Sequence, residues 1–343
     1  MEPLKIVITD CDHESTAIEE EAAGRYSATV RLAQCRTEDE VIAAAQGADG
    51  IVVQYAPVTE RVLAALPSLK AVGRYGVGVD TVDVDAATRR GVAVCNVPDY
   101  GVEDVSDHAL ALALSVARGI VQLDRGVRRG VSTLAPVEPL HRTATRVFGV
   151  VGLGLIGSAT ARKARGVGYT VIACDPRQEP GSVSPDGVPA VTFEELLAAA
   201  DVVSLHVPLN SATHHLMNTD TLSLLKPTAM LVNTCRGGVV DTGALVRALQ
   251  DGRLQAAALD VFEEEPLPLD SPLMGCGNVV LTPHAAWYSE ESYVELKRRT
   301  IENVLDVCSG AVPRNILNPG VLERGISGGT APAPAGSVDG RRQ

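Results

Sequence analysis

Short apolar runs alternate with stretches of helical spacing along most of the chain. In its first part, apolar runs predict strands at residues 5–9, 50–54, 71–74 and 92–96, with a weaker one at 29–32. Helical stretches lie between them at 38–45 and 60–66, and a short helix is expected within 80–90. Alternation of this kind is typical of a parallel sheet covered by helices. We therefore predict an α/β fold.

The second part of the chain repeats this rhythm. A long helix rich in alanine and leucine is predicted at 102–120, followed by a connection without clear period at 125–145. Further strands are predicted at 147–151, 170–174, 202–206, 230–235, 256–261 and 279–282. Helices are predicted at 193–199, 219–225 and 242–251, with a last one at 290–308. This set of strands suffices for a complete, doubly wound dinucleotide-binding domain.

The strand at 147–151 opens a compact glycine motif. Gly152, Gly154 and Gly157 follow it in the order G-x-G-x-x-G, and a helical stretch then leads to the next strand. The first glycine permits a tight turn, the second lets the backbone approach a pyrophosphate, and the third lets helix and strand pack closely. The helix N-terminus faces the negative phosphates. Because strands flank the motif on both sides, it is much more specific than its glycines alone.

An acid closes the second strand of this unit. Asp175 lies eighteen residues past the last glycine of the motif. A carboxylate at about this spacing binds the ribose 2′-hydroxyl of NAD, and it would repel the 2′-phosphate of NADP. Arg177, two residues further on, could soften that preference. The predicted cofactor is NAD.

Composition and net charge limit which binding partners and which cellular compartment are expected. The 343 residues suffice for two domains, and 45% apolar with 21% charged residues describe a soluble globular protein. A formal net charge of −12 argues against a nucleic-acid-binding surface and against an anionic membrane surface. The seven cysteines include no C-x-x-C pair, so we interpret them as reduced thiols, with no disulfide framework and no metal site. Without a signal-peptide layout, a cytoplasmic location is expected.

Polar residues gather where three of the later strands end. Residues 233–238 read NTCRGG, 260–266 read DVFEEEP and 282–287 read TPHAAW. Open α/β sheets bind ligands outside the carboxyl ends of their strands, so these clusters should converge. An arginine fork holds a carboxylate, and a histidine passes a proton to or from an oxygen near neutral pH. Singly, Arg236 could be a salt-bridge partner, the acids at 263–265 a solvated loop and His284 a satisfied strand-end side chain. Together they indicate a catalytic site.

Five motifs carry a family resemblance. They are GRYGVGVDTVDVDAATRRG (73–91), VVGLGLIG (150–157), LVNTCRGGVVD (231–241), ALDVFEEEP (258–266) and LTPHAA (281–286). With them the chain resembles, over about residues 3–320, the D-2-hydroxyacid dehydrogenases, which include phosphoglycerate, glycerate and D-lactate dehydrogenases. Within that family, HAAWYSEE (284–291) most resembles the branch of the C-terminal-binding-protein corepressors. Leu155 departs from the pattern, because the family often has Arg or Lys there.

The resemblance implies a catalytic set of Arg236, Glu265 and His284. Arg236 would bind the carboxylate and the carbonyl oxygen, His284 would act as general acid and base, and Glu265 would orient and tune His284. Formate oxidation is disfavoured, since formate enzymes of this pattern have Gln beside the histidine.

The family's binding residues carry over in the same way. Cofactor contacts fall on Gly152, Leu153, Gly154, Leu155, Ile156, Gly157, Asp175, His206, Val207, Pro208, Thr234, Cys235, Arg236, Asp260 and His284, with Asp260 toward the nicotinamide carboxamide. Substrate contacts fall on Tyr75, Val77, Gly78, Arg236 and Trp287. The backbone N–H groups of Val77 and Gly78 would grip the substrate carboxylate.

The resemblance also implies the domain layout. A flavodoxin-like substrate-binding domain would comprise residues 1–99 and a returning C-terminal helix at 289–320. A Rossmann-type NAD-binding domain would occupy 100–288, with substrate in the cleft between the two. Residues 321–343, with their GTAPAPAGS composition, predict a disordered tail. Family members are usually homodimers built across the cofactor domain, and a homodimer is expected here.

The function predicted on these grounds is reversible hydride transfer between the nicotinamide of NAD and C2 of a D-2-hydroxy or 2-oxo acid. Two alternatives stay open. One is oxidation of phosphite or another phosphonate-type oxyanion on the same fold, since Arg236 suits any small oxyanion. The other is a corepressor-like binding module that uses NAD(H) to set its oligomeric state.

Overall fold

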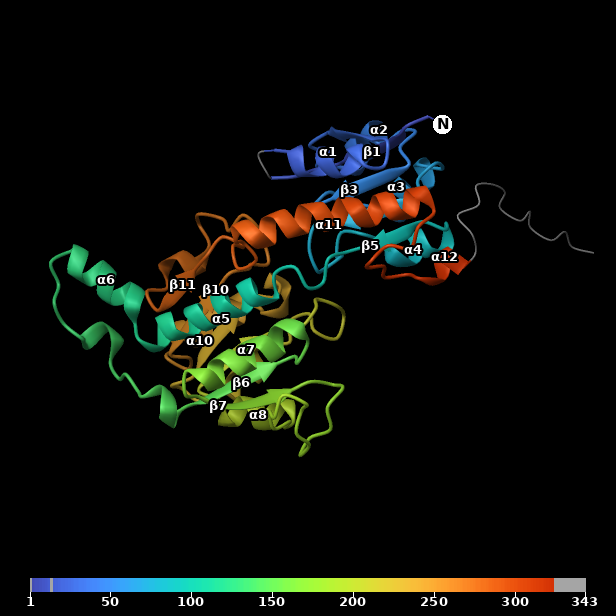
Figure 1. Ribbon diagram of the computed structural model, residues 1–343. Coiled ribbons are helices and arrows are strands. Elements are labelled where there is room, and N and C mark those ends of the chain that lie inside the picture. Colours follow the sequence, from blue (N-terminus) through green and yellow to red (C-terminus); the bar gives the residue numbers. More distant parts are fainter. Residues whose placement is uncertain (1, 13–14, 324–343) are drawn as a thin grey trace, which may run out of the picture. The chain divides into compact units, whose positions relative to one another are not determined.

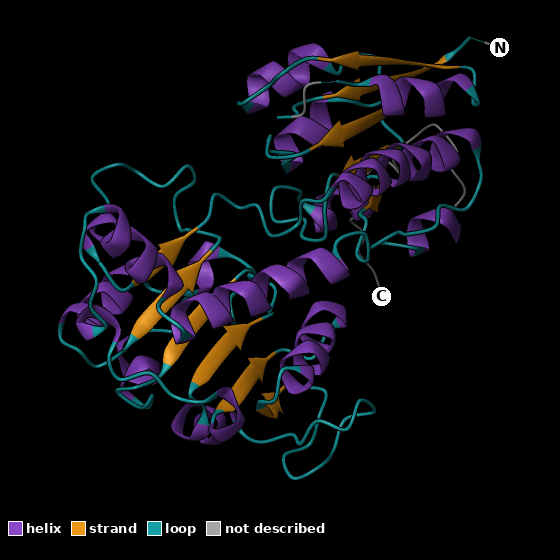
Figure 2. Cartoon of the chain, turned by 60° about the vertical axis from the view of Figure 1, so that its left-hand side comes forward, coloured by secondary structure: helices purple, strands orange, loops and turns teal. Residues whose placement is uncertain are grey.

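The chain forms two compact units. The computed structural model describes residues 2–12 and 15–323. Unit 1 consists of the residues up to Pro98 and the described residues from Val294 onward, and unit 2 is Asp99–Tyr293. Each unit is built on its own parallel sheet with helices on both faces (Figures 1 and 2). The predicted domain boundaries were 99/100 and 288/289, so the observed return to unit 1 comes a few residues later in the sequence.

The sheet of unit 1 has the strand order β2-β1-β3-β4-β5, all parallel. Its strands are β1 (Leu4–Ile8), β2 (Ala28–Leu32), β3 (Gly50–Val53), β4 (Ala71–Arg74) and β5 (Ala93–Cys95). Its connecting helices are α1 (Ala17–Gly24), α2 (Glu38–Ala44), α3 (Glu60–Ala65) and α4 (Val84–Arg89). This is the flavodoxin-like order, which confirms the predicted fold.

A long C-terminal helix completes unit 1. Helix α11 (Glu290–Ser309) starts in unit 2 and belongs to unit 1 from Val294 onward. Cβ atoms placed on Gly50 and Gly73 would lie 2.4 and 2.6 Å from methyl groups of Val304, so these glycines let α11 pack close to the sheet. Helix α12 (Gly320–Glu323) covers the first residues of the predicted tail, and the rest of that tail lies outside the described residues.

The sheet of unit 2 has six parallel strands in the order β11-β10-β9-β8-β6-β7. They are β6 (Val147–Val151), β7 (Thr170–Cys174), β8 (Val202–Leu205), β9 (Met230–Asn233), β10 (Ala256–Leu259) and β11 (Val279–Leu281). The helices are α5 (Val102–Ala117), α6 (Ile120–Arg128), α7 (Leu155–Gly166), α8 (Phe193–Ala199), α9 (Thr219–Ser223) and α10 (Thr242–Gln250). Strand order reverses at β6, which places the glycine motif at the topological switch point where such sheets bind nucleotides.

Two apolar cores cover the two faces of this sheet. Helices α5 and α7 pack on one face against Phe148 and Val150, and α8, α9 and α10 pack on the other against Val151. Val150 and Val151 are both buried because successive side chains of a strand point to opposite faces. A strand buried on both faces reads as a continuous apolar run, which is the pattern that predicted it.

Besides α12, helices α1 and α6 were absent from the sequence prediction. The long helix predicted at 102–120 ends at Ala117, and α6 begins at Ile120, so the expectation of an irregular connection from 125 is wrong for its first residues. Gly119 breaks the two apart, since its φ of 61° is left-handed and a Cβ there would lie 2.4 Å from Val137. Helix α1 was missed because its acidic sequence, AIEEEAAG, lacks an apolar stripe.

All seven cysteines lie in the described part of the chain and carry free thiols. Within residues 2–12 and 15–323, no helix is both long and apolar enough to cross a membrane.

Candidate active site

The glycine motif forms the turn between β6 and α7. Gly152 has a φ of 96°, and a Cβ atom there would lie 2.4 Å from the carbonyl oxygen of His206. A Cβ atom on Gly157 would lie 1.9 Å from the carbonyl oxygen of Gly152. Neither position therefore accepts a larger residue, and the turn brings the first turn of α7 against the end of β8.

The first turn of α7 presents its amides openly. Gly154 is the N-cap residue and supplies no capping side chain, and a Cβ there would meet no atom within 4 Å. Among the described residues, the amides of Leu155, Ile156 and Gly157 have no acceptor. Open amides at a helix N-terminus, with the positive end of the helix dipole behind them, bind phosphate. These residues thus fit the pyrophosphate of a dinucleotide.

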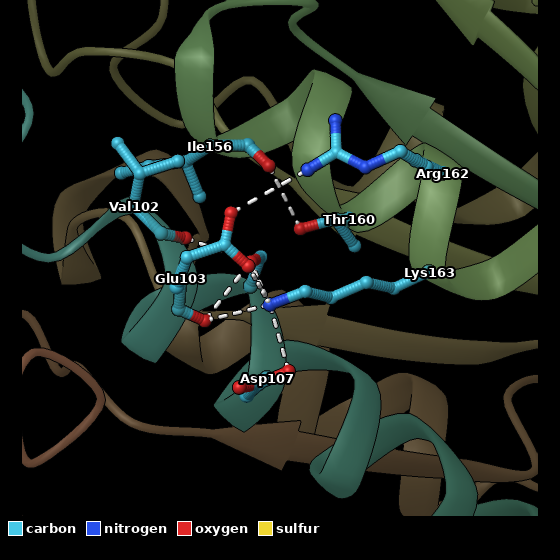
Figure 3. Close-up of polar contacts among 8 residues, drawn as sticks. Val102, Glu103, Asp107, Ile156, Thr160, Arg162 and Lys163 are labelled. Atoms are coloured by element: carbon cyan, nitrogen blue, oxygen red, sulfur yellow. Dashed lines mark hydrogen bonds and ion pairs between the residues drawn. The ribbon is translucent and has the colours of Figure 1, made fainter.

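Helix α7 is fastened to α5 by a lysine. Lys163 lies between Asp107 and Glu103, with Nζ 2.7 and 2.8 Å from their carboxylate oxygens (Figure 3). Burial lowers the pKa of Lys163, but its hydrogen bonds to these two acids outweigh that effect, so the pKa lies above its ordinary value. The contact fixes the helix whose N-terminus fits the phosphates. Asp107 and Glu103 thus join α5 to α7 through Lys163.

Asp175 ends β7 beside the glycine turn, as predicted from its spacing. Its carboxylate accepts four hydrogen bonds, from the amides of Leu153 and Arg177 at 2.7 and 2.9 Å and from Nε and Nη2 of Arg177 at 2.9 and 2.8 Å. These bonds, those of the Arg177 side chain foremost, lower the pKa of Asp175 to about 2. The acid that would bind the ribose is thus covered by an arginine.

The remaining predicted cofactor residues lie mostly at the ends of β8 and β9. His206, Val207 and Pro208 follow β8, and Thr234 and Cys235 follow β9. Burial lowers the pKa of His206 to about 4, so its ring is neutral at pH 7. Burial also raises the pKa of the Cys235 thiol, which donates to Oδ1 of Asn233 at 3.1 Å. This part of the edge therefore carries no charge.

Arg236 follows directly and is held by its own turn. Its Nη1 donates to the carbonyl oxygen of Cys235 at 2.7 Å, and its carbonyl oxygen accepts from Nδ2 of Asn233 at 2.9 Å. A Cβ atom on Gly237 would lie 1.8 Å from the carbonyl carbon of Phe262. The loop that carries Arg236 therefore packs backbone to backbone on the loop that carries the acids at 263–265.

Glu265 and His284 form a directly bonded pair. His284 Nδ1 lies 2.7 Å from Oε2 of Glu265, and the φ of His284 is left-handed at 54°. Burial raises the pKa of Glu265, but its hydrogen bond to His284 and the charges of His284 and Arg236 leave that pKa below its ordinary value. The three predicted catalytic residues therefore lie together. Because Nδ1 faces Glu265, Nε2 is the atom of His284 left for a substrate.

Asp260 holds the turn that carries His284. Its side chain is fully buried, and its oxygens accept the amides of Ala285 and Ala286 at 2.9 Å each and the hydroxyl of Thr282 at 2.6 Å. That hydroxyl has one hydrogen, so it must accept from Nε2 of His108 on α5, 3.0 Å away. Asp260 was predicted to lie toward the nicotinamide carboxamide, whereas His108 carried no sequence signal because it lies within α5, outside every motif.

Aromatic residues follow the histidine. Trp287 lies 6.4 Å from Tyr100 and 5.5 Å from Tyr288 between ring centroids, and Tyr288 is half exposed. All of them belong to unit 2. Trp287, predicted to line the substrate pocket, is thus packed in an aromatic cluster three residues after His284.

The predicted substrate loop of unit 1 comes after β4. Val77 is 39% exposed, and among the described residues the amides of Val77 and Gly78 donate to no acceptor. Tyr75, also predicted to contact substrate, is 3% exposed, and its hydroxyl donates to Glu19 inside unit 1. The loop therefore offers backbone amides, while the tyrosine side chain faces inward.

The amino-acid sequence of unit 2 matches a known protein family. Residues 110–286 match the model described as "D-isomer specific 2-hydroxyacid dehydrogenase, NAD binding domain". The chain belongs to this family. The match spans the glycine turn and all of β6–β11, so unit 2 contains the NAD-binding domain, which confirms the predicted family and cofactor.

Relatives extend the match to most of the chain. It is 42% identical over 270 residues to the glyoxylate reductase of Korarchaeum cryptofilum, covering 78% of this chain and 81% of that protein. It is 36% identical over 317 residues to the D-3-phosphoglycerate dehydrogenase of Methanocaldococcus jannaschii, covering 92% of this chain and 59% of that protein. Among solved structures, D-lactate dehydrogenase from Aquifex aeolicus complexed with NAD and lactic acid has a TM-score of 0.81 and 28% identity, covering 91% of this chain and 99% of that one.

Proposed function

We propose that this family member catalyses hydride transfer between NAD and C2 of a small D-2-hydroxy or 2-oxo acid. One observation carries the proposal: Nδ1 of His284 lies 2.7 Å from Glu265, at a sheet edge where Arg236 is near enough to lower the pKa of that glutamate. An arginine, an ionised acid and an oriented histidine are the groups that a reacting carbonyl beside a carboxylate requires.

Each residue has a separate task in the proposed reaction. The guanidinium of Arg236 holds the carboxylate and polarises the carbonyl oxygen of a 2-oxo acid. Nε2 of His284 gives a proton to that oxygen during reduction and removes the hydroxyl proton during oxidation. Glu265 accepts from Nδ1 and stabilises the positive charge of the ring when both nitrogens are protonated. The bound nicotinamide supplies or accepts the hydride.

Backbone amides without an acceptor among the described residues would bind the cofactor phosphates and the substrate carboxylate. The amides of Leu155, Ile156 and Gly157 would hold the pyrophosphate, and Asp175 would hold the ribose, provided that Arg177 moves aside. The amides of Val77 and Gly78 would bind the substrate carboxylate, since they are donors without an acceptor in the described residues.

A panel of 2-oxo acids with NADH and NADPH tests the reaction. The panel would contain glyoxylate, pyruvate and 3-phosphohydroxypyruvate, with phosphite and NAD as the alternative reaction. His284→Ala should lower kcat at least 100-fold on the best substrate, since general acid–base catalysis contributes about 10²–10⁴-fold. His141→Ala, a change at an exposed histidine before β6, is the control. A His284→Ala enzyme within tenfold of wild type would contradict the assignment.

We also propose that the protein is a homodimer formed through unit 2. Helix α6 has no buried residue among its nine, and Ile120 and Val127 are 55% and 68% exposed. Figure 1 shows α6 and the segment after it extending away from the sheet of unit 2. Exposed apolar side chains on a helix that extends from its sheet favour an interface between two copies of the chain. The molar mass by light scattering should be that of two chains, and Ile120→Glu/Val127→Glu should give one.

A further inference from the structure

Unit 1 contains a buried charged cluster that the proposed reaction does not use. Lys297 of α11 and Glu19 of α1 are both fully buried, with Nζ 3.3 Å from Oε2. The hydroxyl of Tyr75 donates to the other oxygen of Glu19 at 2.5 Å, and Nζ of Lys297 also donates to the carbonyl oxygen of Ser15. We call Lys297, Glu19 and Tyr75 the buried triad.

Stability alone does not account for the buried triad. Taking two charges out of water costs several kilocalories per ion, and well-packed apolar residues in the same space often give an equal or more stable protein. Lysine and glutamate are rarely fully buried. A charged pair in this position is therefore weak evidence for a stabilising role.

The position of Tyr75 indicates another role for the buried triad. Tyr75 immediately precedes Gly76, Val77 and Gly78, the loop with open amides. The backbone of this loop is tied from one side: the amide of Tyr75 donates to Val53 at 2.9 Å, and the carbonyl oxygen of Gly76 accepts from Val97 at 3.0 Å. Nδ2 of Asn96 donates to the carbonyl oxygen of Val77 at 2.7 Å. With the carbonyl groups bound inward, the amides of Val77 and Gly78 face away.

We propose that the buried triad positions this loop for binding the carboxylate of the substrate, an inference that rests on the proposed function. Lys297 forms an ion pair with one oxygen of Glu19 at 3.3 Å, and the other oxygen accepts the hydrogen bond from the hydroxyl of Tyr75. The tyrosine ring is thereby held at one end by the loop backbone and at the other by a hydrogen bond to a charged acceptor. Tyr75 is a positioning residue, and it acts through the amides of Val77 and Gly78.

A charge-balanced variant separates positioning from stability. Glu19→Leu/Lys297→Met removes both charges at once, so neither is left buried without a partner, and it also removes the acceptor of Tyr75. We expect the melting temperature to be kept or raised, while KM for the best 2-oxo acid rises at least tenfold. kcat should change less than KM, because a carboxylate contact is made in the ground state and in the transition state alike. The Kd for NADH should stay within twofold.

Two further variants complete the design. Tyr75→Phe keeps the ion pair and removes only the hydroxyl, so it serves if the double variant fails to fold, and it should raise KM three- to tenfold. Val62→Ala shortens a fully buried side chain of α3 in the same unit, and it should lower the melting temperature without changing KM. Amide hydrogen exchange of residues 75–78 should accelerate in the triad variants and stay unchanged in Val62→Ala.

The outcomes distinguish this inference from the proposed function. If wild type turns over a 2-oxo acid and both triad variants keep KM within twofold and the same exchange at 75–78, the positioning role is overturned. If wild type reduces no 2-oxo acid, the proposed function fails, and the exchange measurement still decides whether the triad orders the loop. A lower melting temperature with unchanged KM and unchanged exchange would leave the triad a purely structural role and overturn the proposal.

Discussion

We expect the arginine that covers Asp175 to set the relative use of NADH and NADPH. All four hydrogen bonds to that carboxylate come from the protein, and two of them come from the side chain of Arg177. A carboxylate offers about four acceptor positions, so a ribose hydroxyl must displace the guanidinium before it binds. The same guanidinium is a ready partner for a 2′-phosphate. We predict that wild type uses NADPH as well as NADH and that Arg177→Ala weakens the NADPH reaction.

The expected effect of Arg177→Ala on kcat/KM follows from the exposure and the charge of the arginine side chain. The Arg177 side chain is 69% exposed, so breaking its ion pair with Asp175 costs about 1 kcal/mol or less, and Arg177→Ala should raise kcat/KM for NADH by up to about fivefold. A hydrogen bond to a charged group contributes about 1.5–3 kcal/mol, so loss of the phosphate contact should lower kcat/KM for NADPH by about 10- to 100-fold. The ratio of kcat/KM for NADH to that for NADPH should therefore increase by about 10- to 500-fold.

Parallel initial rates with the two cofactors provide the assay. They are measured with the best 2-oxo acid for wild type, Arg177→Ala and Arg253→Ala. The last variant removes another exposed arginine of unit 2, which pairs with Asp251 at 3.0 Å, and controls for the loss of one positive charge. Equal changes with both cofactors in Arg177→Ala, or the same pattern in Arg253→Ala, would contradict this prediction.

Three other changes test the site. Gly237→Ala would place a Cβ 1.8 Å from Phe262, so it should separate the loops of Arg236 and Glu265 and lower kcat by about 100-fold or more, with NADH titration as the control for folding. Asp260→Asn replaces one acceptor oxygen by an NH2 group that faces the backbone amides of the His284 turn. It should lower the free energy of unfolding in urea by about 1–3 kcal/mol. An unchanged unfolding midpoint would contradict the role of Asp260. The pKa of Asp175, lowered by Arg177 to about 2, lies below the unfolded value of about 3.9. This carboxylate therefore stabilises the fold above about pH 4 by about 2 kcal/mol and loses that contribution as the pH falls toward 2, a dependence that Asp175→Asn should lack in acid unfolding.

The sequence predicted the strands and the strand ends more fully than the side-chain partners. Strands buried on both faces leave continuous apolar runs, so all six strands of unit 2 were found, and a sheet edge collects their polar ends. Helix α6 and its break at Gly119 were missed although Ile120, Leu123 and Val127 recur at helical spacing, because this short stripe begins where the predicted long helix ends. Glu19 and Lys297 pair across most of the chain, and no local pattern indicates which acid a lysine will meet.

Three acids at strand ends share one arrangement, and it explains how the loops keep their shape. Asp10 follows β1 and accepts the amides of residues 54–56 after β3, Asp175 follows β7 and accepts the amide of Leu153 after β6, and Asp260 follows β10 and accepts those of residues 285 and 286 after β11. In each case the acid binds the loop of the neighbouring parallel strand. Hydrogen bonds to a carboxylate contribute about 1.5–3 kcal/mol, enough to fix a loop that would otherwise move. An acid directly after a buried strand therefore predicts that its carboxylate binds the loop after the neighbouring strand of the sheet. The sequence carries this signal at Asp10 as plainly as at Asp175.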